Sequence, residues 1–89
     1  MISDFVRVEE AIAAHRKCVE LTPDWIWCQL GLTVDYVLVG NTDQAATQAK
    51  EALRINPKIT ASDSTYVRAI ADPAQRADII AALRRAGLK

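Results

Sequence analysis

Apolar residues along the N-terminal two thirds of the chain recur every three or four positions, the spacing of one face of an α-helix. Thr22-Pro23 and Gly40-Asn41 interrupt this pattern with residues that end helices and form turns. Asp24 and Thr42 follow the interruptions and are suited to cap the next helices. The predicted helices cover 4–21, 24–39 and 42–55.

The segment 24–39 is the most apolar part of the chain. After Asp24, its polar side chains are Gln29, Thr33 and Asp35. Its tryptophans and β-branched residues would also suit a β-strand. Its length and the helical patterns on both sides favour a helix. A helix that is apolar on nearly all sides is expected to be covered on most of them.

The pattern changes after Pro57. Residues 60–70 predict a short helix that begins near Thr60 or Ser62. Asp72-Pro73 is a strong helix start, with Asp at the N-cap and Pro at the first helical position. The last helix is predicted over 73–86, and Gly87 follows it as the residue that ends the helix. The chain is therefore expected to be all-α, with five helices in one domain, 1–89.

Two similar segments end at prolines 34 residues apart: EAIAAHRKCVELTP at Pro23 and QAATQAKEALRINP at Pro57. This period is that of tetratricopeptide repeats, which the chain resembles. With Ile26 at position 1 of the repeat, family-typical residues are Leu32, Tyr36, Gly40, Ala45, Ala52, Leu53 and Pro57. The chain departs from the family at Gln29, Thr33 and Ala49.

The resemblance implies a right-handed stack of antiparallel helices. Its parts would be a half repeat over 4–23, a full repeat over 24–57 and capping helices over 58–89. The tail, from Asp72-Pro73-Ala74 to Leu83-Arg84-Arg85-Ala86-Gly87-Leu88, is similar to the C-terminal repeat regions of bacterial class III adenylate/guanylate cyclase-type proteins. No cyclase catalytic domain fits in this chain, so only the role of a terminal interaction segment is implied.

The charge balance excludes some classes of partner. Lys and Arg together number 11, as do Asp and Glu. A neutral chain offers no field for nucleic acid or an anionic membrane, and no apolar run approaches the ~20 residues that span a bilayer. We expect a cytoplasmic protein in which Cys18 and Cys28 are free, buried thiols.

No residue pattern indicates a catalytic, cofactor or metal site. His15 is the single histidine, and it falls on the packing stripe of the first helix, so a structural role is expected rather than that of a base. Cys18 would add only a second metal ligand. The sequence therefore predicts a protein that is not an enzyme and needs no cofactor.

Repeats of this family usually bind partners through the concave face of their first helices. The corresponding residues are Trp27, Leu30, Val34, Val37 and Leu38, and all are apolar. Such a face is rarely left open in a soluble monomer. Three covers are considered: the chain's own C-terminal helices, a second copy in a homodimer, or an apolar helical segment of a partner protein. Arg84 and Arg85 would form a charged rim. The alternative is a structural remnant of a longer cyclase-like regulatory protein, without a partner of its own.

Overall fold

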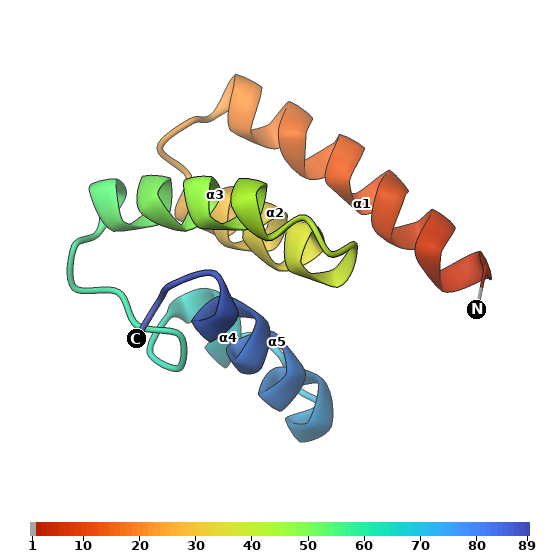
Figure 1. Ribbon diagram of the computed structural model, residues 1–89. Coiled ribbons are helices and arrows are strands. Elements are labelled where there is room, and N and C mark those ends of the chain that lie inside the picture. The colour runs from red at the N-terminus through yellow and green to blue at the C-terminus, as the bar shows by residue number, and fades with distance from the viewer. Residues whose placement is uncertain (1) are drawn as a thin grey trace.

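The computed structural model describes the backbone of residues 2–89 and the side chains of residues 7–64 and 66–89. Over these residues the fold is all-helical, as predicted, with five helices and no strand (Figure 1). The helices are α1 (Ile2–Leu21), α2 (Ile26–Leu38), α3 (Thr42–Ile55), α4 (Thr65–Arg68) and α5 (Pro73–Arg85). None of the helices in this part of the chain is long and apolar enough to cross a membrane.

Helix α2 is the centre of the molecule. It packs against α1, α3 and α5. In Figure 1, α1 lies on one side of the α2–α3 pair, and α4 and α5 lie on the other. This position explains why nearly every direction around α2 is apolar, since a helix with neighbours on three sides buries most of its surface.

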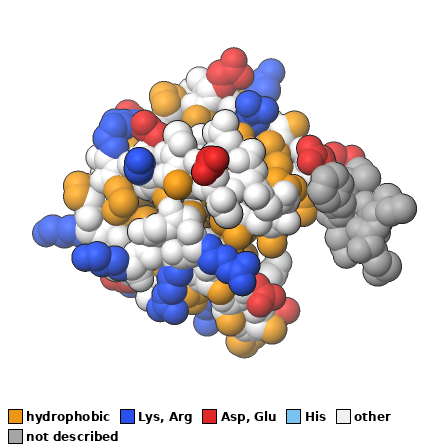
Figure 2. Space-filling model, viewed as in Figure 1, with side chains coloured by type: hydrophobic (Ala, Val, Ile, Leu, Met, Phe, Trp, Pro, Cys, Tyr) orange, Lys and Arg blue, Asp and Glu red, His pale blue; other side chains and the backbone are white. Residues whose placement is uncertain are grey.

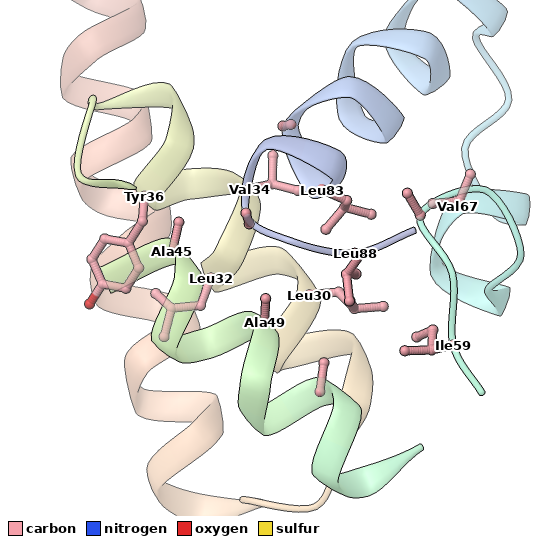
Figure 3. Packing of buried hydrophobic residues seen from close by; sticks show 14 of the residues in the cluster. Leu30, Leu32, Val34, Tyr36, Ala45, Ala49, Ile59, Val67, Leu83 and Leu88 are labelled. Carbon is pink, nitrogen blue, oxygen red and sulfur yellow. The ribbon is translucent and has the colours of Figure 1, made fainter. Parts of the chain in front are cut away.

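The hydrophobic core joins α2 to both α3 and the C-terminal segment (Figure 3). Ala45, Ala49 and Ala52 form the buried face of α3, and their small side chains let the bulkier α2 approach closely. On another side of α2, Leu30 and Leu83 are fully buried. The core therefore depends on contacts between residues distant in sequence.

The start of α2 differs from the prediction. The helix begins at Ile26, and Trp25 occupies the N-cap without a side-chain hydrogen bond. Asp24 does not cap it, because its Oδ1 accepts a hydrogen bond from Arg54 Nη2 of α3 at 3.2 Å. The turn before α2 is held in another way: Gln29 donates from Nε2 to the carbonyl of Pro23 at 3.1 Å. This bond gives the buried Gln29 side chain a structural role.

Helix α3 covers its predicted range, 42–55, but Asn41 rather than Thr42 is its N-cap. Asn41 Oδ1 accepts from the backbone N–H of Gln44 at 3.3 Å. The preceding helix ends at Leu38 because Gly40 adopts a φ of 80°, which favours glycine. The backbone N–H of Asn41 then bonds to the carbonyl of Tyr36 at 2.8 Å, completing a Schellman motif.

The C-terminal helices are shorter than predicted. Instead of spanning 60–70, α4 is a single turn, because residues 61–64 form bends and Ser64 Oγ accepts from the N–H of Val67 at the helix start. Helix α5 begins as predicted, since Asp72 Oδ1 accepts from the N–H of Ala74 at 3.0 Å. It ends at Arg85, one residue early, before Gly87 with a φ of 116°. At the other end of the chain, α1 begins at Ile2 rather than residue 4.

Candidate interaction surface on α2 and α5

The predicted concave residues divide into a buried middle and exposed ends. Leu30 and Val34 are 0% and 5% exposed, and Val37 is half-buried. Trp27 and Leu38 are 36% and 61% exposed. The five side chains therefore do not form the continuous apolar surface that their spacing suggested.

The middle of this face is covered by the C-terminal segment of the same chain. Figure 3 shows Leu83 and Leu88 packed beside Leu30 and Val34. Leu88 is held there by a second Schellman motif, in which its backbone N–H bonds to the carbonyl of Leu83 at 3.1 Å. Of the three covers considered, the chain's own C-terminal helix supplies the one over Leu30 and Val34.

Leu38 stands between two surface hollows at the junction of α2 and α5. One hollow, of about 350 Å³, is lined by Val34, Asp35, Tyr66 and Asp78 among others. The other, of about 330 Å³, lies between Val37 on α2 and Ala81 and Arg85 on α5. Leu38 and Asp78 line both hollows. The most exposed part of the predicted face is thus a leucine ridge flanked by two depressions.

Of the two arginines predicted to form a charged rim, only one lies at this surface. Arg85 lines the hollow beside Leu38, whereas Arg84 does not. Asp78, which the sequence did not single out, lies on the same side of α5. Its position seven residues before Arg85, two turns along one helix, is the signal that could have paired them.

The other exposed end of α2 is aromatic. The ring centroids of Trp25 and Trp27 lie 6.1 Å apart. Tyr66 from α4 meets Trp27 edge to face, also at 6.1 Å between centroids. Burial, followed by the nearby charge of Asp35, raises the pKa of the Tyr66 phenol. These contacts anchor α4 on α2 and leave part of the tryptophan surface open to solvent.

His15 and Asp35 form a polar link between α1 and α2. His15 Nδ1 and Asp35 Oδ2 are 2.5 Å apart, and the hydrogen bond to Asp35 raises the pKa of His15 although burial opposes the shift. The imidazole ring lies over Gly31, where an added Cβ would come within 2.7 Å of Nε2. The ring is thus held between helices. Asp35, a lone carboxylate in an apolar helix, was the available sequence signal for this link.

Cys18 and Cys28 are joined in a disulfide, so the expectation of free thiols is wrong. Their Cα atoms are 6.0 Å apart, a spacing typical of such bonds. The turn at Pro23 folds α2 back along α1 and brings the two inward-facing cysteines together. Among the described residues, no group of three or more His, Cys, Asp or Glu side chains could hold a metal ion.

Comparison of the chain with protein-family models, with curated proteins and with solved structures gives no match. The functional assignment therefore depends on the surface just described and on the repeat-like spacing of the sequence.

Proposed function

We propose that the chain is a non-catalytic protein-interaction module of tetratricopeptide type that associates with a second copy of itself. The observation that carries the proposal is the exposure of Leu38, which is 61% accessible on a predicted contact position beside two hollows. A single exposed leucine is common on protein surfaces, and Leu21 is more exposed still. What sets Leu38 apart is that it lines two hollows at a position where repeats of the resembled family contact their partners.

The position of the exposed side chains on α2 supports this choice of side. On the face shown in Figure 2, hydrophobic side chains are interspersed with charged ones. Trp27 and Leu38 lie on one helix, and each is next to side chains of the C-terminal segment. A partner that contacts α2 would therefore also contact α4 or α5.

Sedimentation velocity over a range of concentrations up to about 100 μM tests self-association, since dimer stability depends on protomer concentration. We expect the native chain to form dimers and Leu38→Asp to form monomers with unchanged far-ultraviolet circular dichroism. Leu21→Asp is the matched control, because Leu21 is 71% exposed at the end of α1, outside both hollows. A native chain that stays monomeric throughout would disprove self-association.

Val34 is unsuitable as the probe. It is buried under α5, so Val34→Asp would place an unpaired charge in the core and unfold the chain. The sequence alone offered Val34 and Leu38 as equivalent contact residues. The tertiary structure distinguishes between them.

The cytoplasmic location suggested by the sequence forms part of the proposal and can be tested through the cysteines. Disulfides are uncommon in a reducing cytoplasm. The location therefore requires Cys18 and Cys28 to be reduced in the cell. Trapping thiols at lysis, followed by mass spectrometry, would show two alkylated cysteines in that case, and an intact disulfide would point to an oxidising compartment.

A further inference from the structure

The outer face of α5 carries a regular row of exposed side chains. Ala74, Asp78, Ala81 and Arg85 follow one another at intervals of four, three and four residues, and all are exposed. This spacing puts them on one side of the helix, as in the seam of a coiled coil. Alanine at two of the positions would let another helix approach closely.

The two charges in this row are self-complementary. Asp78 and Arg85 are two helical turns apart, about 10.5 Å along the axis. Within the part of the chain whose side chains the structure describes, neither has an ion-pair partner. When two such helices run antiparallel about a two-fold axis, each Asp78 faces the partner's Arg85, and the pair occurs twice.

The neighbouring surface has both a projecting apolar side chain and hollows that could receive one. Leu38 projects beside the row, between hollows that are bordered by Asp78 on one side and by Asp78 and Arg85 on the other. The two-fold axis that pairs Asp78 with Arg85 passes midway between them, near residues 81 and 82. Because Leu38 lines the same hollows as these two residues, it would lie at this interface, opposite the hollows of the other copy. Knobs and holes of this kind are how packed helices exclude water.

We propose that two copies of this chain pair through antiparallel α5 helices, with Leu38 seated in the partner's hollow and Asp78 paired with the partner's Arg85. This inference rests on the proposed self-association and specifies its geometry. A second copy is the favoured occupant because the row carries one acid and one base at the spacing that matches itself. A purely basic or acidic partner segment would leave one of the two charges opposed by its own sign.

Charge reversal on the full-length chain tests the pairing. Asp78→Arg and Arg85→Asp each convert two attractive contacts into two repulsive ones, so each should weaken dimerisation about tenfold or more at low salt. The double variant Asp78→Arg/Arg85→Asp restores opposite charges at both contacts. Its dissociation constant should return to within about threefold of the native value.

Mixing the two single variants is the sharpest experiment. A copy with Asp78→Arg and a copy with Arg85→Asp oppose unlike charges at both contacts, so they should form a heterodimer although neither forms a strong homodimer. Native mass spectrometry of the equimolar mixture identifies the heterodimer by mass.

Arg84→Asp is the matched control. This substitution changes the net charge as Arg85→Asp does, and in the same turn of α5. Residue 84, however, lies about 100° around the helix from Arg85. Arg84→Asp should leave dimerisation within about threefold of native, and it should not pair preferentially with Asp78→Arg. Circular dichroism of each variant checks that the helix is retained.

The outcomes separate the two proposals. If the native chain dimerises but Arg84→Asp and Arg85→Asp behave alike, or the mixture gives no heterodimer, the α5 pairing is wrong and self-association stands. If the native chain is monomeric, the proposed self-association fails and the pairing fails with it.

Discussion

Both sides of α2 pack through apolar residues, Ile12 being the buried one from α1, but only the α1 side adds covalent and polar links. On the α1 side, a disulfide and the His15–Asp35 hydrogen bond link the two helices. On the α5 side, Leu30, Leu83 and Leu88 form a buried apolar cluster. The added links on the α1 side depend on redox state and pH, whereas the α5 attachment depends on removing apolar surface from water. We infer that the α1 junction responds to conditions and the α5 junction provides constant stability.

The largest expected effect is on the apolar side. Leu83→Ala removes a fully buried side chain, and it should lower the free energy of unfolding by about 3–4 kcal/mol. Urea denaturation followed by circular dichroism measures the change. Leu38→Ala changes an exposed position, so it should change the free energy of unfolding by no more than about 0.5 kcal/mol when the chain is monomeric. Equal costs for the two substitutions would mean that α5 does not pack on α2 as described.

Breaking the disulfide should have the next largest effect. The bond joins residues with a sequence separation of 10. For a loop of this length, chain entropy predicts that reduction lowers the free energy of unfolding by about 3 kcal/mol. The midpoint of urea denaturation with and without reductant gives the value. A Cys18→Ala/Cys28→Ala variant should not respond to reductant. A native chain whose midpoint is also unchanged by reductant would contradict the contribution of the bond.

The His15–Asp35 link should make stability depend on pH. Its hydrogen bond raises the pKa of folded His15 above the ordinary 6.5, so the protonated ring binds its proton more tightly in the folded state. This stabilisation is fully present below the unfolded pKa and is lost as pH rises through the folded pKa. Unfolding free energy should therefore fall as pH increases above about 6.5. His15→Gln should abolish that slope, and an unchanged slope would assign it to other groups.

Gly31→Ala should have the smallest net effect on stability. The new Cβ would displace the His15 ring and weaken its bond to Asp35, while alanine is favoured over glycine within a helix by up to about 1 kcal/mol. We expect these effects to offset each other near neutral pH. The informative readout is the histidine titration by NMR, in which the pKa of His15 should fall toward its ordinary value. An unperturbed titration would show that the ring does not depend on Gly31.

Local signals account for much of the fold. The helical periodicity predicted five helices, and Asp72-Pro73 and Gly87 marked the ends of α5 to within a residue. The predicted helix starts were wrong where more than one hydrogen bond was available to a capping side chain or to a helix N-terminus. Asp24 bonds to Arg54 rather than capping α2, and Ser64 rather than Thr60 or Ser62 starts α4. Local sequence cannot rank such competing hydrogen bonds, because the choice depends on groups brought near by the fold.

The candidate surface was only half predictable. The resemblance to tetratricopeptide repeats identified Leu38 and Trp27 together with Leu30 and Val34, as residues of one predicted contact face. Which of them would be exposed depended on where α5 crosses α2. The spacing of residues within either helix does not determine where the two helices cross.

The sequence by itself determined that the protein is helical, where its helices lie apart from α4, and that α2 must be covered on most sides, because these properties follow from local spacing and burial. Only the tertiary structure decided what covers α2: α5 lies over Leu30 and Val34, the alanine face of α3 lies on another side, and α1 is joined through the disulfide and the His15–Asp35 link. It also brought Leu38, Asp78 and Arg85 to one surface. The physical reason is that contacts between distant segments depend on the packing of whole helices, which local patterns do not encode.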